Sequence, residues 1–169
     1  MCPDICQLIP KMCYTALVQP PFYASGFLYS LKTHQILLLK SQQKDSTDFL
    51  WSTLGGESSE GEEAQIAFQR IINELLDLNL KTKNIYPVYD YFYDTEDKIN
   101  YVFYGEVKSS RDFSRLKEGT FSWVAFNETS KLPFDAHSKQ DVLIGERVIN
   151  AKLREDEAKK LVPFSKPTL

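Results

Sequence analysis

Residues 51–78 read Trp-Ser-Thr-Leu-Gly-Gly-Glu-Ser-Ser-Glu-Gly-Glu-Glu-Ala-Gln-Ile-Ala-Phe-Gln-Arg-Ile-Ile-Asn-Glu-Leu-Leu-Asp-Leu, and this stretch decides the fold. A strand-like run stops at Gly55-Gly56, and an acidic loop follows as far as Gly61. From Glu62 to Leu78 no glycine or proline interrupts apolar residues spaced three and four apart, which is the periodicity of an amphipathic helix. The stretch therefore predicts a strand, a glycine-containing loop and a helix over 62–78.

The runs on either side of this stretch predict further strands and a second long helix. Their order favours an α+β fold, an α/β/α sandwich built on a mixed sheet. No linker divides the chain, so we expect one domain over 1–169 with flexible ends at 1–13 and 154–169. Strands are expected at 14–18, 25–31, 35–40, 49–54, 85–93, 99–107 and 121–126, and the second helix at about 138–153, capped by Ser138.

The composition narrows the class of protein. The net charge is −3 and the pI is near 5.5, so the chain lacks the basic excess that drives nonspecific nucleic-acid binding. The longest apolar runs have four residues, as at 36–39, far short of the roughly 20 that span a bilayer. No signal-peptide pattern is visible, and Cys2, Cys6 and Cys13 form no paired metal or disulfide motif. We expect a cytoplasmic protein that inserts into no membrane.

The spacing within 51–78 resembles the Nudix box, which reads Gly, five residues, Glu, seven residues, Arg-Glu-apolar-x-Glu-Glu-x-Gly-apolar. Gly56 is followed six positions later by Glu62, and Arg70 stands eight positions beyond that. Ile72 and Leu78 fill the two apolar positions, and Glu74 fills the first position of the Glu-Glu pair. Similarity at 24–39 and 118–134 extends the resemblance over about 14–150. The resemblance implies a Nudix fold and a magnesium- or manganese-dependent pyrophosphohydrolase of nucleoside diphosphates linked to another group.

The departures from this box concern the metal site. Ile71, Leu75 and Asp77 stand where the family has Glu, Glu and Gly. Magnesium and manganese need several converging carboxylate oxygens, and positions 71, 74, 75 and 78 share one helix face. Glu74 alone remains of three expected carboxylates, so we expect a weak metal site or none, and no tightly bound ion. By the same resemblance, Glu62 lies near the metals and pairs with Arg70.

Two further features concern a ligand. Eight aromatic residues crowd the strands 85–93 and 99–107, and Tyr89, Tyr91 and Phe103 are candidates to stack on a nucleotide base. Pairing of these rings across the sheet is the alternative. Lys40 ends a strand at a position where family members often direct a basic residue to phosphate; a solvated lysine is the alternative.

Three functions stay open at this stage. The first is a Nudix-fold protein that binds a nucleotide-like ligand and hydrolyses it weakly or not at all, with Glu62 and Glu74 as the remaining catalytic candidates. The second is an active hydrolase with displaced ligands such as Glu62, Glu74 and Asp77. The third is a non-enzymatic scaffold for protein or RNA, and homodimerisation is open in each case. Ile71→Glu together with Leu75→Glu would rebuild three carboxylates with Glu74, and we expect this double variant to stay folded and to gain magnesium binding.

Overall fold

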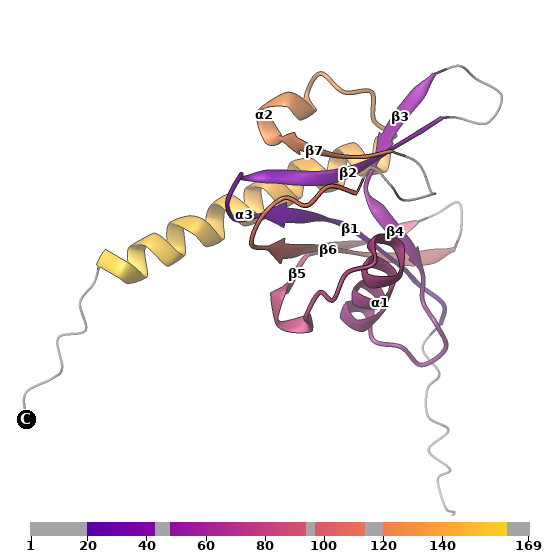
Figure 1. The fold of residues 1–169 in the computed structure, drawn as a ribbon. Helices are drawn as coiled ribbons and strands as arrows, with labels where there is room; N and C mark the ends of the chain where they lie inside the picture. Colours follow the sequence, from indigo (N-terminus) through magenta and orange to yellow (C-terminus); the bar gives the residue numbers. More distant parts are fainter. Residues whose placement is uncertain (1–19, 43–47, 94–96, 114–119, 162–169) are drawn as a thin grey trace, which may run out of the picture.

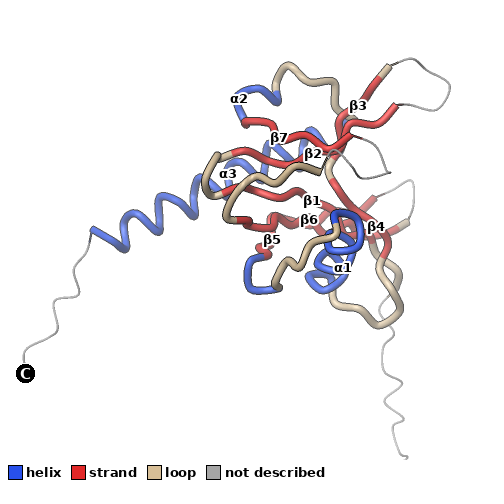
Figure 2. Tube along the Cα trace, in the orientation of Figure 1, coloured by secondary structure: helices blue, strands red, loops and turns tan. Residues whose placement is uncertain are grey.

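The computed structural model describes residues 20–42, 48–93, 97–113 and 120–161. Within these residues one mixed sheet has the order β3-β2-β1-β6-β5, with β4 also paired to β1 and β7 to β2. Helices α1 and α3 cover its two faces, as Figures 1 and 2 show, so the expected α/β/α arrangement is confirmed. The elements are β1 (Tyr23–Ser30), β2 (Gln35–Gln42), β3 (Phe49–Ser52), β4 (Leu54–Glu57), α1 (Ala64–Leu76), η1 (Thr82–Asn84), β5 (Ile85–Tyr93), β6 (Lys98–Val107), β7 (Thr120–Ala125), α2 (Phe126–Thr129) and α3 (Ala136–Leu161).

Strand β1 lies at the centre of the sheet, parallel to β6 and antiparallel to β2 and β4. Successive side chains of a strand point to opposite faces. Accordingly, Ala24 and Leu28 belong to the core under α1, whereas Phe27 and Tyr29 belong to the core under α3. Ser25 therefore lies on the α3 face, where its hydroxyl contacts Asn100 of β6 and Asp141 of α3.

Helix α1 is shorter than the sequence predicts and runs from Ala64 to Leu76. It ends at Asp77, which takes the left-handed conformation with φ 48°. Glycine is the usual residue at such a cap and aspartate tolerates it, so Asp77 can stand where the resemblance expects glycine. The strand does not stop before Gly55-Gly56: both glycines lie inside β4, paired with Ser25 and Ala24.

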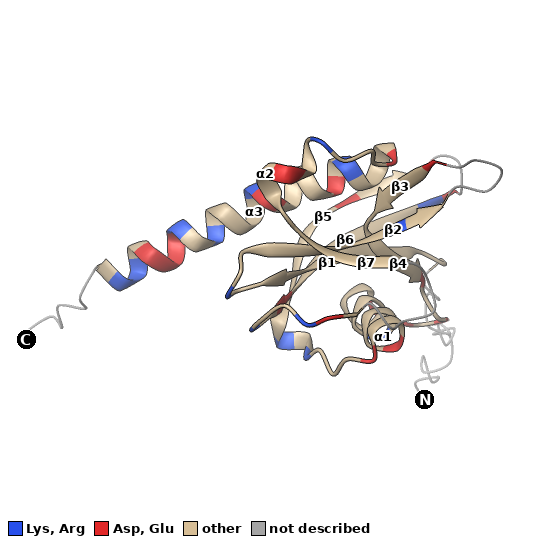
Figure 3. Ribbon diagram, turned by 45° about the horizontal axis from the view of Figure 1, so that its top comes forward, with Lys and Arg blue, Asp and Glu red and all other residues tan. Residues whose placement is uncertain are grey.

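Helix α3 is longer than the sequence predicts. It begins at Ala136 because the side chain of Asp135 accepts a hydrogen bond from the Ser138 backbone N–H at 2.8 Å, so Asp135 rather than Ser138 caps it. It continues to Leu161, beyond residue 153 where the sequence predicts its end, and residues of both charge signs alternate along this last part of the ribbon (Figure 3). The predicted strand 14–18 and the ends 1–13 and 162–169 lie outside the described residues.

Gly145 and Lys152 are two of the residues that bind α3 to the sheet. A Cβ on Gly145 would lie 2.4 Å from the Phe27 ring, so the absence of a side chain allows the helix to approach β1 closely. About one turn beyond Ile149, the last buried residue of α3, Lys152 Nζ lies 3.6 Å from the centre of the Tyr86 ring and 2.5 Å from Glu106 Oε1. Among the described helices, none is long and apolar enough to cross a membrane.

Candidate functional site

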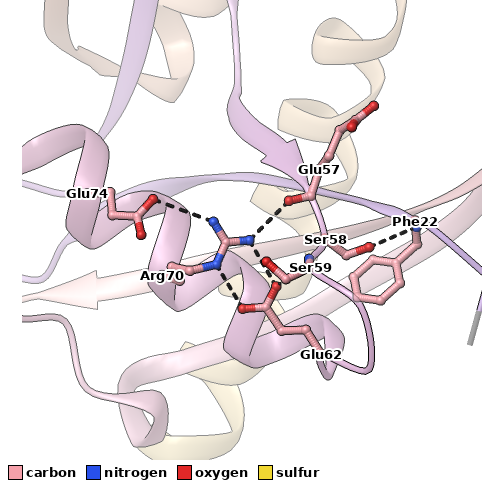
Figure 4. Close-up of polar contacts among 7 residues, drawn as sticks. All are labelled: Phe22, Glu57, Ser58, Ser59, Glu62, Arg70 and Glu74. Carbon is pink, nitrogen blue, oxygen red and sulfur yellow. Dashed lines mark hydrogen bonds and ion pairs between the residues drawn. The ribbon is translucent and has the colours of Figure 1, made fainter. Parts of the chain in front are cut away.

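The loop between β4 and α1 is closed by an arginine. Arg70 donates from Nε and Nη2 to the two carboxylate oxygens of Glu62, both at 2.9 Å, and from Nη2 to the Glu57 backbone carbonyl at 3.1 Å (Figure 4). Glu62 also accepts the Ser59 backbone N–H at 2.8 Å. The hydrogen bond from Arg70 lowers the pKa of Glu62, whose side chain is 11% exposed. The expected ion pair is therefore formed, and it binds both ends of the loop to the helix.

We expect Arg70→Met to loosen this loop. The substitution removes the three hydrogen bonds that Arg70 donates to the loop and leaves the Glu62 carboxylate without its cation, so the free energy of unfolding should fall by about 1–3 kcal/mol. Amide hydrogen exchange should speed up at 57–62. Glu74→Gln is the matched control, because Glu74 is 67% exposed and lies 3.5 Å from Arg70, where an ion pair contributes little. Equal effects of the two variants would contradict the assignment.

The metal-site face of α1 lacks oxygen donors at two of its positions. Ile71 is 8% exposed and packs over Gly56, whose missing Cβ would lie 3.3 Å from the isoleucine side chain. Leu75 is half-buried, and Glu74 turns to solvent beside Arg70 (Figure 4). Among the described residues no three His, Cys, Asp or Glu side chains cluster closely enough to hold a metal ion. The donor set on this face does not fit the magnesium or manganese that the resemblance implies.

A cavity of about 440 Å³ lies next to this face. Leu75 of α1 lines it on one side, Leu39 of β2 and Gly55 of β4 line it from the sheet, and α3 contributes its first two turns. Its volume lies within the range of small-molecule sites. The polar and aromatic residues that line it include Ser25, Thr53, Tyr91, Tyr93, Asn100, His137, Ser138 and Asp141.

Asp141 of α3 is a buried carboxylate at the cavity, 1% exposed. Tyr89 donates its hydroxyl to Oδ1 at 2.7 Å, and the Thr53 and Ser25 hydroxyls approach Oδ2 at 3.4 and 3.5 Å. Burial raises the pKa of Asp141 to about 6, although the Tyr89 hydrogen bond acts in the opposite direction. Burial, together with the Asp141 hydrogen bond, also raises the pKa of Tyr89.

Asn100 of β6 continues this network and is 4% exposed. Its Nδ2 donates to Ser25 Oγ at 2.9 Å and to the Tyr91 hydroxyl at 2.8 Å. Its Oδ1 is buried and has no hydrogen-bond partner among the described residues. A polar network thus connects β1, β5, β6 and α3 at the cavity.

Aromatic rings form another part of the cavity lining. The His137 ring stacks on Tyr91 at a centroid distance of 5.5 Å and an interplanar angle of 3°, and lies 4.5 Å from the Tyr93 ring. A β-bulge between Pro87 and Tyr89 shifts the alternation of β5. The rings of Tyr89, Tyr91 and Tyr93 consequently share the α3 face, as their spacing predicts.

The structure brings some of the predicted ligand residues together and separates others. Tyr91 lines the cavity, and Tyr89 supports it from beneath through Asp141. Phe103 lies on the opposite face of the sheet, buried in the core under α1 and stacked on Phe68 at 5.5 Å. Lys40 Nζ lies 4.8 Å from the Phe49 ring centre and is not part of the cavity lining.

The residues of the site that were not predicted include Asn100, His137 and Asp141, together with Ser25 and Thr53. One signal for Asp141 was available in the sequence. Ser138, Asp141, Gly145 and Ile149 repeat at helical spacing and form the buried stripe of α3, so a carboxylate on that stripe is an anomaly that needs partners. Asn100 and His137 carry no comparable local signal.

The fold and the site together define a structural class of protein. A mixed sheet lies between two helices, and a strand–loop–helix element closed by an arginine–glutamate pair lies beside a ligand-sized cavity. Residues 21–144 match the family model of the NUDIX domain, so the chain belongs to the Nudix family. No curated protein sequence matches the chain significantly.

Solved structures support the fold. The solution structure of the E. coli ORF135 protein has a TM-score of 0.60 at 16% identity, covering 78% of this chain and 91% of that one. The E. coli dihydroneopterin triphosphate pyrophosphohydrolase has a TM-score of 0.56 at 19% identity, with 76% and 95% covered. The C-terminal domain of mouse MUTYH, solved in complex with human PCNA, has a TM-score of 0.56 at 11% identity, with 78% and 91% covered.

Proposed function

We propose that this Nudix-fold protein binds a nucleotide-like ligand in the 440 Å³ cavity and hydrolyses pyrophosphate linkages weakly or not at all. One observation carries the proposal. Leu75, at a position where the resemblance expects a metal-binding carboxylate, lines the same cavity as the Tyr91 and His137 rings. A ligand in the cavity would therefore meet an apolar side chain where a hydrolase of this family needs metal-bound water.

The remaining acidic residues of the box give little support for hydrolysis. Glu62 is occupied by Arg70 and the Ser59 N–H, and Asp77 forms the exposed cap of α1. Glu74 is left as a single exposed carboxylate. One carboxylate holds magnesium only weakly, because the ion demands near-octahedral oxygen coordination. Magnesium or manganese would be required for any residual activity.

Ligand binding is supported by the character of the cavity. Aromatic rings at one side and buried hydrogen-bonding groups beneath are the usual composition of a site for a planar organic molecule. Tyrosine rings at this position would also report binding by fluorescence. A binding role for a protein partner is the alternative, since the similar MUTYH domain was solved in complex with PCNA.

The test is a hydrolysis and binding screen over nucleoside triphosphates and nucleoside diphosphates linked to sugars. We expect no phosphate or pyrophosphate release that depends on magnesium or manganese, and saturable quenching of tyrosine or tryptophan fluorescence by at least one compound. An active Nudix hydrolase serves as the positive control for the assay. Calorimetric titration with magnesium alone should give no tight stoichiometric binding.

Two outcomes would overturn the proposal. A metal-dependent rate that is lost in Glu74→Gln would identify an active hydrolase with displaced ligands. The absence of any saturable binding would remove the ligand-binding function and favour the scaffold for a protein or RNA partner.

A further inference from the structure

A second cavity, of about 280 Å³, lies at the other end of the two central parallel strands. Ser25 and Asn100, which line the 440 Å³ cavity, lie near the beginnings of β1 and β6. Leu31 and Val107, which line the second cavity, lie where these strands end. At about 3.3 Å per residue, about 20 Å of β1 separates the two cavities, so the second one takes no part in the proposed function.

The walls of the second cavity are apolar and are held in place by the fold. Its apolar lining residues are Leu31, Leu78, Leu80 and Val107. Leu80 packs against β6 at Gly105, where a Cβ would lie 2.8 Å from the leucine side chain. Side chains of α1 hydrogen-bond both the N–H and the C=O of Leu80, and the Leu31 N–H donates to the Val107 carbonyl at 2.9 Å. Because Leu31 is nevertheless 44% exposed, the cavity is preformed and open to a partner.

Exposed lysines surround this cavity. Lys108 lines it, and three more lysines are chain neighbours of lining residues. These three are Lys32, Lys81 and Lys83. All four lysines are exposed, and none of them forms an ion pair with another of the residues that the structure describes. Their charges are therefore free to attract an acidic partner.

The carboxylates at this end of the sheet do not balance the lysines. Glu106 lines the cavity but pairs with Lys152 of α3 at 2.5 Å, and Asp77 is the exposed cap of α1. Positive charge is thus in excess here, although the whole chain has a net charge of −3. We call the second cavity, with its four lysines, the basic groove.

The lining of the basic groove favours a peptide over other acidic ligands. Among the described residues no aromatic ring lines it, so single-stranded nucleic acid would lack the rings on which bases stack. Its volume lies below the roughly 300–1,000 Å³ of small-molecule sites, and it therefore suits a side chain better than a whole ligand. The side-chain amides of Asn79 and Asn84, which also line it, can hydrogen-bond the N–H and C=O groups of an extended peptide.

We infer that the basic groove binds an acidic peptide segment of a protein partner, with a large apolar side chain of the peptide between the leucines and its carboxylates against the lysines. Attraction between opposite charges increases the rate of encounter, whereas burial of the apolar side chain contributes affinity. The inference goes beyond the proposed function, because it concerns a different cavity and a different class of ligand.

The first arm of the test identifies the peptide. A phage-displayed library of random dodecapeptides is selected against the full chain, and the enriched peptides are synthesised with a fluorescent label. We expect sequences that combine several aspartates or glutamates with leucine, isoleucine or phenylalanine. Their affinity should fall about 3- to 10-fold between about 50 and 300 mM NaCl, because salt screens exposed charges. Absence of enrichment, or enriched peptides without acidic residues, would overturn the inference.

The second arm varies the protein. Lys108→Glu should weaken the tightest peptide about tenfold, whereas Lys131→Glu, the same change at an exposed lysine outside the groove, should alter its affinity less than about twofold. Leu31→Gln should weaken the peptide about 3- to 10-fold, and Leu143→Gln, at a residue of α3 that is 51% exposed, is its matched control. Circular dichroism establishes that all four variants are folded. Equal affinities of the groove variants and their controls would contradict the inference.

Two other occupants of the basic groove are distinguished by the same proteins. If a single-stranded RNA of random sequence displaces the peptide and loses affinity in Lys108→Glu, the groove is a nucleic-acid surface and the inference is wrong. If the chain associates with itself in sedimentation, and Lys108→Glu but not Lys131→Glu abolishes this, the groove binds a second copy and the inference is again wrong. A compound that fills the 440 Å³ cavity should not displace the peptide, so each of the two proposals can fail without the other.

Discussion

The substitution Ile71→Glu is expected to lower the free energy of unfolding by about 3–5 kcal/mol. Ile71 is 8% exposed, belongs to the core under α1 and packs directly over Gly56. Glutamate at this position would lose the apolar packing and place a carboxylate where the neighbouring residues of the described core are apolar. Since domains are typically stable by only 5–15 kcal/mol, the variant should be largely unfolded at mild urea concentrations.

Urea unfolding followed by tryptophan fluorescence measures this effect. Ile66→Glu is the matched control, because Ile66 lies on the same helix and is 39% exposed, so its replacement should change stability by less than about 1 kcal/mol. Leu75 is half-buried beside the cavity, so the loss of stability in Leu75→Glu should lie between those of Ile71→Glu and Ile66→Glu. If Ile71→Glu were as stable as the wild type, water would have to reach the face of α1 that carries Ile71.

The burial of Ile71 also changes what we expect of the double variant Ile71→Glu and Leu75→Glu, which the sequence predicts to stay folded and to gain magnesium binding. Because Ile71 is part of the core, the structure predicts instead that this double variant is destabilised. On this face of α1, the Ile71 side chain fills the space against Gly56 of β4.

The features that could be predicted from the sequence depend on the spacing of residues close together in the chain. The helix around Arg70 follows from apolar periodicity. The Glu62–Arg70 ion pair follows from the resemblance to the Nudix box, in which these two positions lie eight residues apart. The hairpin of β5 and β6 follows from two aromatic runs and the polar turn between them. Each of these relations lies within about 25 residues of sequence, where pattern and resemblance are informative.

The cavity could not be predicted in this way, because its groups meet only after folding. Ser25 and Asp141 are 116 positions apart, and Asn100 and Ser25 are 75 apart. The His137 ring stacks on Tyr91 because the β-bulge in β5 turns Tyr91 toward α3, and this bulge was not predicted from the sequence. The length of α3 was underestimated for a different reason: its last turns are exposed and charged, so they carry no apolar stripe, although Glu155 and Lys159 pair one turn apart.

The substitution Asp141→Asn is expected to change how stability depends on pH. Burial raises the pKa of Asp141 in the folded chain to about 6 from an ordinary value of 3.8. The folded state therefore binds the extra proton more tightly than the unfolded state. The stability from this proton is complete below about pH 4 and is lost as the pH rises through about 6, a total of about 3 kcal/mol for a shift of about two units.

Asparagine retains the shape of the side chain and an acceptor for the Tyr89 hydroxyl, but it carries no charge to bury. The variant should thus gain stability relative to the wild type as the pH rises, by about 3 kcal/mol from about pH 3.5 to 7.5, with about half of the change above pH 5. The charged groups near Asp141 are Asp135, which raises its pKa, and His137, which lowers it, and both are present in wild type and variant.

Urea unfolding of both proteins across this pH range measures the difference. Asp90→Asn is the matched control, since Asp90 is an exposed aspartate of β5 and its replacement also removes one negative charge. If the stability of Asp90→Asn relative to the wild type rises with pH in the same way, the effect is due to net charge. If the stability difference between Asp141→Asn and the wild type does not depend on pH, the burial of an ionised carboxylate is contradicted. A gain in the stability of Asp141→Asn that grows with pH would show that the ionised Asp141 carboxylate beneath the cavity lowers the free energy of unfolding at neutral pH. Such a cost is typical of groups retained for a binding site, because an apolar residue on that stripe of α3 would stabilise the fold better.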